Sequence, residues 1–201
     1  MRSKGANRTA LMILSIGLAL SMRNLLVFGF GPDIQRYSIP LKEGIAIGSI
    51  VVTSYQLAVV ATALVLMFAI HRLLTRTTMG KAMRALSDNM DLASVSGIDV
   101  DRVIRFTWAI GMALAAAAGI LYGLITNVNP NMGWFMVIPI FSAAILGGIG
   151  NPYGAMLGGM VIGLSQEIST IFLPSEYKIA VSFFIMIAVL LLWPQGIMGA
   201  R

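Results

Sequence analysis

Four polar side chains inside long apolar runs are the first candidates for chemistry in this chain. Arg23 and Asn24 interrupt the first apolar run, and Gln166 and Glu167 interrupt a later, glycine-rich run. A charge inside a bilayer is costly, which makes these residues candidates for lining a transport pathway or contacting a zwitterionic ligand. The alternatives are a polar contact between helices or, for Arg23, a side chain that extends to the membrane interface. We favour these alternatives.

The remaining reactive residues argue against an enzyme. The sequence has no cysteine and one histidine, His71, which excludes thiolate catalysis and disfavours a histidine-based metal site or triad. It contains no Gly-x-x-x-x-Gly-Lys-Ser/Thr nucleotide loop and no Gly-x-Ser-x-Gly nucleophile motif. We therefore expect the chain to hydrolyse no ATP itself and to bind no metal or cofactor.

The composition indicates that lipid is part of the solvent of this protein. Of 201 residues, 58% are hydrophobic and 11% are charged, whereas a soluble domain carries roughly 25% charge. So few charges cannot cover a globule of this size, and the high hydrophobicity excludes intrinsic disorder. The expected fold class is an all-α polytopic membrane protein that forms a single transmembrane domain over residues 1–201.

The apolar runs predict about six membrane-embedded helices, since a spanning helix needs about 20 mostly apolar residues. The fourth run is short enough to be a half-span, so the fourth and fifth helices form either two full spans or a re-entrant hairpin. Pro174 and Pro194 end the last helices because proline cannot continue a helix. The six runs cover residues 10–30, 45–70, 103–125, 134–149, 152–172 and 177–193.

The positions of the cations predict the orientation of these helices. Ten of the fourteen Lys and Arg residues lie before the first run, in or beside the loop at 71–105, or at the C-terminus. Three lie on the opposite side, namely Arg36, Lys42 and Lys178. Because cytoplasmic loops are enriched in Lys and Arg, both termini and this loop are expected in the cytoplasm. The net charge of +6 thus reflects the orientation of the chain in the membrane. Binding to nucleic acid would instead need Lys and Arg clustered on one exposed face.

One alternative concerns the first residues of the chain. A basic start, an apolar stretch and the sequence Ala-Leu-Ser at 19–21 are similar to a cleaved signal peptide. Its removal would oblige the second run to enter the membrane with a reversed charge bias, so we favour a retained first helix.

The long loop between the second and third runs, residues 71–103, carries helical pattern. Met79, Ala82, Met83 and Leu86 share one helical face, and 87–89 offers caps for a second short helix that ends at Gly97. Asp99 is placed to cap the helix that follows. Such a helix pair either lies with its apolar face on lipid or docks in the groove of a soluble partner. The pattern alone weighs these alternatives equally.

Several motifs in this order resemble a known family. The stretch 79–85, Met-Gly-Lys-Ala-Met-Arg-Ala, resembles the cytoplasmic coupling loop of permeases in ATP-binding-cassette (ABC) importers, most of all the branched-chain and neutral amino acid permeases. The segments 144–155, 174–178, 193–197 and 16–18 are similar to the same family, as is the pair at 23–24, so the resemblance runs nearly end to end. On this resemblance, the ATPase-coupling residues are Gly80, Lys81, Ala82, Arg84, Ala85, Asn89, Ala93, Gly97 and Ile98.

The resemblance implies a function and a set of partners. It implies a permease subunit of the bacterial inner membrane that takes up branched-chain or other neutral amino acids, with ATP bound by separate ATPase subunits. The implied partners are those ABC ATPases, a second homologous permease subunit, membrane lipid, and a periplasmic or lipid-anchored substrate-binding protein. Family members have further spans in front and an Asn-Phe-Ala-His-Gly motif, which this sequence does not contain. We therefore expect the chain to lack their N-terminal third.

The glycine-rich segment at 147–154 cannot be an ordinary helix interior, because three glycines and a proline interrupt it within six residues. Broken backbone at membrane depth is tolerated where protein or water surrounds it, so a re-entrant segment beside the pathway is one hypothesis. A plain cytoplasmic turn is the other. The residues concerned are Gly147, Gly148, Gly150, Asn151, Pro152 and Gly154.

Pairs of glycines four residues apart predict close helix packing. They occur at 119 and 123, at 154 and 158, and at 159 and 163. Small residues let membrane helices approach closely, either within the chain or against a second subunit.

The functional alternative to an importer is an ion-coupled carrier or channel, which would need intramembrane acidic or histidine relays, and only Glu167 offers one.

Overall fold

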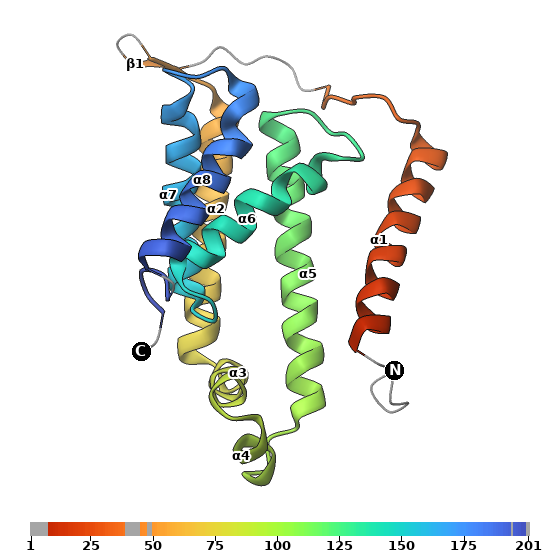
Figure 1. The fold of residues 1–201 in the computed structure, drawn as a ribbon, viewed down its shortest axis with the longest axis vertical. Helices are drawn as coiled ribbons and strands as arrows, with labels where there is room; N and C mark the ends of the chain where they lie inside the picture. The colour runs from red at the N-terminus through yellow and green to blue at the C-terminus, as the bar shows by residue number, and fades with distance from the viewer. Residues whose placement is uncertain (1–7, 39–44, 48–49, 194, 200–201) are drawn as a thin grey trace.

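The computed structural model describes residues 8–38, 45–47, 50–193 and 195–199. Its elements are predominantly helical (Figure 1). In chain order they are α1 (Arg8–Phe30), β1 (Ile45–Ile47), β2 (Ile50–Val52), α2 (Ser54–Arg76), α3 (Thr78–Asp88), α4 (Met90–Val95), α5 (Val100–Ile125), α6 (Met132–Gly147), α7 (Pro152–Ser169), the 3-10 turn η2 (Ser175–Tyr177) and α8 (Lys178–Leu192).

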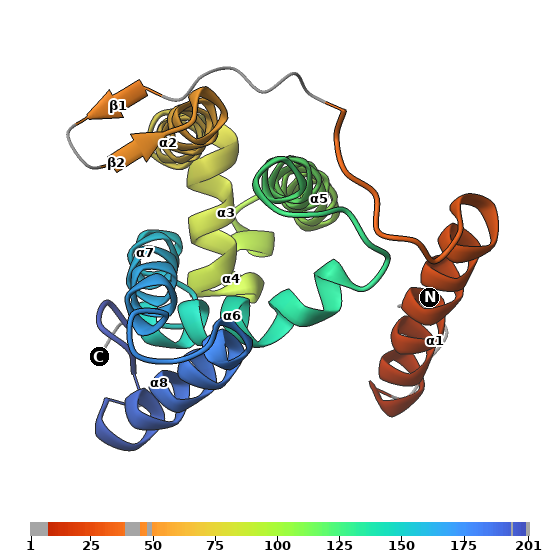
Figure 2. The same cartoon turned by 90° about the horizontal axis from the view of Figure 1, so that it is seen from above.

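The long helices run along the long axis of the molecule. Helices α2 and α5 extend between two ends, one carrying α3 and α4 and the other carrying β1 and the loops after α1 and α5 (Figure 1). Helix α6 crosses obliquely and packs with α7 and α8. Helix α1 stands apart from this bundle in both views (Figure 2).

Four segments of the described chain are long and apolar enough to cross a membrane, namely Thr9–Phe30, α2, α5 and Ser175–Leu192. Helix α6 is apolar but shorter. Together they confirm a polytopic α-helical membrane protein. The described residues also contain an antiparallel β1–β2 hairpin that was not predicted, in which Ile45 pairs with Val52 and Ile47 with Ile50.

The predicted boundaries of the second run were wrong. The run begins at 45, but its first residues form the hairpin and α2 starts only at Ser54. The Thr53 N–H donates to Gln56 Oε1 at 3.0 Å, which caps the new helix start. The β-branched residues before it favour strands over helix because their χ1 angles are restricted in a helix.

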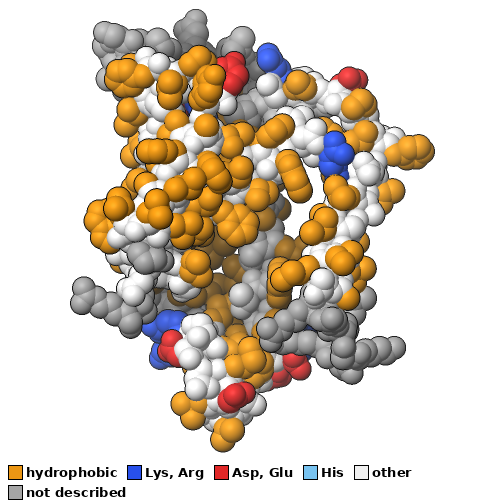
Figure 3. Space-filling view, in the orientation of Figure 1, with side chains coloured by type: hydrophobic (Ala, Val, Ile, Leu, Met, Phe, Trp, Pro, Cys, Tyr) orange, Lys and Arg blue, Asp and Glu red, His pale blue; other side chains and the backbone are white. Residues whose placement is uncertain are grey.

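Most large apolar side chains lie on the outside of the molecule. Leu146, Ile162 and Val189 form a buried cluster between α6, α7 and α8, and Ala93 of α4 and Val103 of α5 are also buried. Phe28, by contrast, is 92% exposed. Hydrophobic side chains cover the middle of the visible face, and charged ones gather mainly towards its two ends (Figure 3). This distribution is the one that a lipid environment stabilises, because lipid replaces the water that would penalise such exposure.

The fold gathers the cations of the long loop at one end. Helix α2 finishes and α5 begins beside α3 and α4, which brings together Arg72, Arg76, Lys81, Arg84, Arg102 and Arg105. Arg36 and Lys178 lie towards the opposite end, since α1 finishes and α8 begins there. The orientation prediction also used Arg2, Lys4, Lys42 and Arg201, which lie outside the described residues.

Candidate functional site

A tight joint connects α3 to α2. The Thr77 hydroxyl donates to the Leu73 carbonyl at 2.6 Å and accepts from the Gly80 N–H at 3.0 Å. Gly80 is buried, and a Cβ added there would lie 2.6 Å from the Cα of Leu74 and collide with the Leu73 carbonyl. Gly80 therefore positions α3 against α2, and its surface is not available to a partner.

The apolar face of α3 turns towards its own chain. Its members Met79, Ala82, Met83 and Leu86 are partly buried, as is Ala85 beside them. A hollow of about 260 Å³ lies between α3 and α5 and is lined by Met83, Leu86, Val103 and Trp108 among others. Helices α2 and α5 thus cover part of this face.

The caps predicted for α4 and α5 are confirmed. Asn89 Oδ1 accepts from the Leu92 N–H at 2.9 Å, and Asp99 Oδ1 accepts from the Arg102 N–H at 2.9 Å. Gly97 adopts φ +84°, the left-handed conformation that ends a helix and that residues with a Cβ rarely adopt. These caps fix the short α4 between two bends.

The outer surface of the α3–α4 pair is both basic and apolar. Lys81 and Arg84 of α3 are exposed, and so are Leu92 at 65% and Val95 at 88% in α4. Ala93 is buried and Ile98 half-buried, so both support the pair from inside. We call Lys81, Arg84, Leu92 and Val95 the outer α3–α4 face. Sequence reasoning missed the last two, although their spacing of three residues places them on one side of a helix.

The glycine-rich segment brings α6 and α7 into backbone contact. A Cβ at Gly147 would collide with the backbone of Gly154, and one at Gly158 would collide with the Ala143 carbonyl. The predicted packing role of Gly154 and Gly158 is thus confirmed within the chain. Gly159 and Gly163, by contrast, have nothing within 4 Å of an added Cβ.

A C-terminal segment closes the turn between α6 and α7. The N–H groups of Ile197 and Met198 donate to the carbonyls of Leu146 and Gly147 at 2.8 and 3.0 Å. The Asn151 Nδ2 donates to the Met198 carbonyl at 2.9 Å. These bonds satisfy the last carbonyls of α6, which have no partner within the helix.

The start of α7 is fixed from both sides. Asn151 Oδ1 accepts from the N–H groups of Tyr153 and Gly154 at 3.0 and 3.1 Å, with Pro152 at the first helical position. His71 Nδ1 lies 3.1 Å from the Tyr153 hydroxyl, which ties the turn to the last turns of α2. The turn therefore lies towards the α3–α4 end. Within it, Gly148 and Gly150 both have positive φ values.

Arg23 and Asn24 continue α1 and do not break it. The Arg23 Nε donates to Asn131 Oδ1 at 2.7 Å, and its Nη1 donates to Asn24 Oδ1 at 3.4 Å. Arg23 thereby links α1 to the residue that precedes α6. A hollow of about 410 Å³ beside this contact is lined by residues of α1 together with Pro130 and Trp134.

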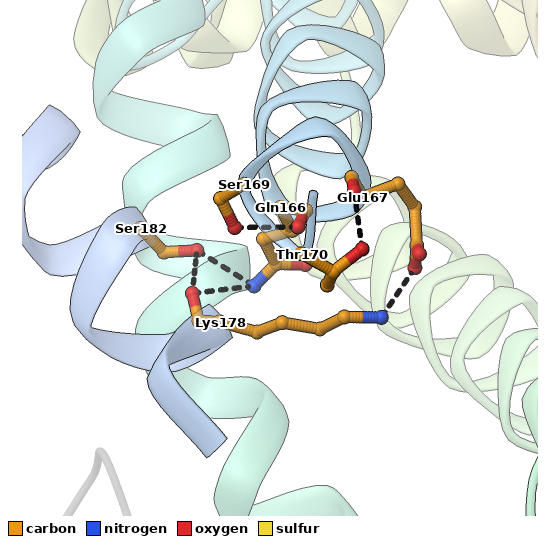
Figure 4. A network of polar contacts seen from close by, with 6 residues as sticks. All are labelled: Gln166, Glu167, Ser169, Thr170, Lys178 and Ser182. Atoms are coloured by element: carbon orange, nitrogen blue, oxygen red, sulfur yellow. Dashed lines mark hydrogen bonds and ion pairs between the residues drawn. The ribbon is translucent and has the colours of Figure 1, made fainter. Parts of the chain in front are cut away.

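Gln166 and Glu167 both contact the start of α8 (Figure 4). The Gln166 Nε2 donates to Ser182 Oγ at 2.7 Å and to the Lys178 carbonyl at 3.3 Å. Glu167 forms an ion pair of 2.7 Å with Lys178 Nζ on the exposed side. The fully buried Ser142 of α6 donates to the Ser182 carbonyl at 3.0 Å, so polar contacts join α6, α7 and α8.

Within the described part of the chain, no three His, Asp or Glu side chains come close enough together to hold a metal ion. The arrangement offers a set of apolar helices, a short helix pair presented at one end, and polar links between helices.

These features define a polytopic α-helical membrane protein with a paired-helix surface at one end. Residues 5–190 match the family described as the permease component of the branched-chain amino acid transport system, and the chain belongs to this family. No solved structure matches the chain.

Curated relatives carry the same description. The chain is 41% identical over 149 residues to the high-affinity branched-chain amino acid transport system permease protein LivH of Escherichia coli, covering 74% of this chain and 48% of the relative. It is 32% identical over 204 residues to BraD of Pseudomonas aeruginosa, covering 98% of this chain and 66% of the relative. A probable LivH of Methanocaldococcus jannaschii is 38% identical over 143 residues, covering 68% of this chain and 45% of the relative. The chain thus matches about half the length of the LivH relatives.

Proposed function

We propose that the chain acts as a permease subunit of an ATP-driven importer that takes up branched-chain or other neutral amino acids across the bacterial inner membrane. The observation that carries the proposal is the family match over residues 5–190, together with an α3–α4 pair held out at one end of the apolar helices. The LivH and BraD relatives are named as branched-chain amino acid permeases.

In this proposal the α3–α4 end faces the cytoplasm and receives a separate ABC ATPase, which binds the ATP. The outer α3–α4 face suits such contact because it offers two exposed apolar side chains and two exposed cations. The chain needs no cofactor of its own. A second permease subunit, lipid and a substrate-binding protein on the opposite side complete the assembly.

The joint at Gly80 suggests how movement of the ATPase reaches the membrane. Because α3 lies against the backbone of α2 at Leu73 and Leu74, a push on the outer α3–α4 face displaces the end of α2 with it. Helix α5 follows Asp99 directly, so α4 and α5 are also linked by a short capped bend. ATP binding would then switch the helices between two arrangements.

The test is co-purification of the ATPase with variants of the outer α3–α4 face. Leu92→Asp and Val95→Asp place a carboxylate in the apolar part of that face, and we expect each to abolish co-purification while membrane insertion persists. Ile34→Asp, a matched change at an exposed residue of the opposite end, should leave co-purification intact.

Uptake assays in vesicles supply the contradicting outcome. Leucine uptake that follows a proton gradient, persists without ATP and needs no ATPase subunit would identify an ion-coupled carrier instead. Co-purification that survives both α4 changes would show that the ATPase docks elsewhere.

A further inference from the structure

A pocket of about 420 Å³ opens at the end of the molecule opposite α3 and α4. Arg36 and Tyr37 line it from the segment after α1, Tyr55 from the start of α2, and Asn127 from the loop after α5. The last turn of α5 supplies the remaining wall. Its volume falls within the range of about 300–1,000 Å³ that is typical of small-molecule sites.

The pocket holds one positioned cation. The Arg36 Nε donates to Asn127 Oδ1 at 2.8 Å, which orients the guanidinium. Among the residues that the structure describes, no hydrogen bond occupies its two terminal nitrogens, which can therefore meet a ligand. The neighbouring residues Gln35 and Val128 exchange two backbone hydrogen bonds of 2.9 Å, which fix the two segments to each other. A guanidinium held in this way is suited to bidentate pairing with a carboxylate.

The end of α5 gives the same pocket a group that attracts positive charge. This helix finishes at Ile125, and the carbonyls of its last turn have no partner within the helix and carry the negative end of the helix dipole. Gly123, Leu124 and Ile125 of that turn line the pocket. Carbonyl oxygens at a helix C-terminus favour a cation such as an ammonium group.

The shape of the pocket depends on Gly123. This buried glycine lies under the Tyr37 ring, and an added Cβ would lie 3.2 Å from Tyr37 Cε2 and 2.8 Å from Val128 Cγ2. The absence of a side chain at Gly123 lets the Tyr37 ring lie close to α5 beside the guanidinium. Leu124 and Ile125 add apolar surface to the same lining.

We propose that this pocket binds the ammonium and carboxylate groups of a free neutral amino acid. Arg36 holds the carboxylate, the carbonyls at the end of α5 hold the ammonium, and Leu124 and Ile125 contact the aliphatic side chain. A simple anion such as phosphate is attracted by Arg36 but repelled by the carbonyls at the end of α5. A simple cation is attracted by those carbonyls but repelled by Arg36. This inference rests on the proposed function and names a binding subsite for its substrate class.

The first test measures ligand binding to the purified 201-residue chain in lipid nanodiscs, with no ATPase present. Radiolabelled leucine should bind and be displaced by unlabelled leucine. Isocaproate, which lacks the ammonium, and isopentylamine, which lacks the carboxylate, should each compete at least about tenfold more weakly, because each loses one charge-assisted contact. Equal competition by either analogue or by inorganic phosphate, or no leucine binding at all, would overturn the proposal.

Variants locate the site. Arg36→Gln should weaken leucine binding at least about tenfold, and Arg36→Lys should restore part of it. Arg105→Gln makes the same charge change near the other end of α5 and should bind like the unaltered chain. Elution as a single species in size-exclusion chromatography establishes that each variant is folded, and Gly123→Ala gives a second, uncharged perturbation of the same wall. Unchanged binding in Arg36→Gln would place leucine elsewhere.

The two proposals fail separately. A chain that binds leucine through Arg36 but recruits no ATPase would contradict the importer and keep the subsite. A chain that recruits the ATPase but binds leucine independently of Arg36 would contradict the subsite and keep the importer.

Discussion

Gly147 and Gly154 touch backbone to backbone, and this contact sets how closely α6 and α7 approach. Neither glycine needs to border a pathway to explain why a side chain is excluded there. The sequence predicted a helix break at this place because glycine and proline disfavour helix interiors. It could not predict that residues 196–198 would return to the same place, since that contact is made only in the folded chain.

Gly154→Ala is expected to lower the free energy of unfolding by about 1–3 kcal/mol, because the new methyl group overpacks a backbone contact. Thermal unfolding in detergent measures the change. Gly159→Ala on the same helix is the matched control, since an added Cβ there meets nothing within 4 Å. Equal stability of the two variants would show that α6 and α7 separate easily.

Gln166 and Glu167 are adjacent in sequence but differ in their expected contribution to stability. Gln166→Ala removes the partner of Ser182 Oγ between packed helices, and it should cost about 1–3 kcal/mol. Glu167→Gln breaks an ion pair whose glutamate side chain is 71% exposed, and exposed pairs contribute at most about 1 kcal/mol. Thermal unfolding of both variants checks the order, and a larger loss for Glu167→Gln would contradict it.

At the scale of elements, the α2–α3 joint is separate from the outer α3–α4 face. Sequence reasoning placed Gly80 and Lys81 in one coupling stretch, but one is buried against α2 and the other is exposed. Helix periodicity predicted the apolar face of α3 and the caps of α4. It could not decide what covers that face, because lipid, a partner and the chain's own helices all present apolar surface.

Gly80→Ala is therefore expected to uncouple the subunits without separating them. The methyl group forces α3 away from α2, so ATPase should still co-purify while leucine-stimulated ATP hydrolysis falls several-fold. Gly111→Ala in α5, where an added Cβ meets nothing within 4 Å, is the control and should keep both properties. Full stimulation in Gly80→Ala would mean that α2 does not transmit the movement.

Average hydropathy does not distinguish the β1–β2 hairpin from the helix that follows it. Residues 45–52 are as apolar as the helix that follows, so a window of average hydropathy joins them to it. Their β-branched composition is the local signal that separates the two. The long apolar helices themselves were predictable from their runs, since four segments of the described chain are long and apolar enough to cross a membrane and α6 is apolar but shorter.

On the scale of the whole molecule, the fold separates two ends with different chemistry. One end carries the outer α3–α4 face, and the other carries the Arg36 pocket. The pocket was not predictable, because Arg36 and Asn127 are 91 positions apart and neither belongs to a motif. Only the return of α5 to the end of α1 brings them together.

The orientation proposal can be tested directly because the chain contains no cysteine. Single substitutions Ser94→Cys in α4 and Ser175→Cys in η2 place one thiol towards each end. A membrane-impermeant maleimide should label position 175 in spheroplasts and position 94 only in inverted vesicles. Labelling of both positions from the same side would contradict the proposed topology.

The bonds from Ile197 and Met198 to the end of α6 also impose an order on biosynthesis. The Leu146 and Gly147 carbonyls emerge from the ribosome well before their partners, which follow α7 and α8 in the chain. Until α8 has been synthesised, this end of α6 must therefore be satisfied by water or by temporary partners, since bare carbonyls are costly in lipid. The final arrangement at this end of α6 can therefore form only after α7 and α8 have been synthesised.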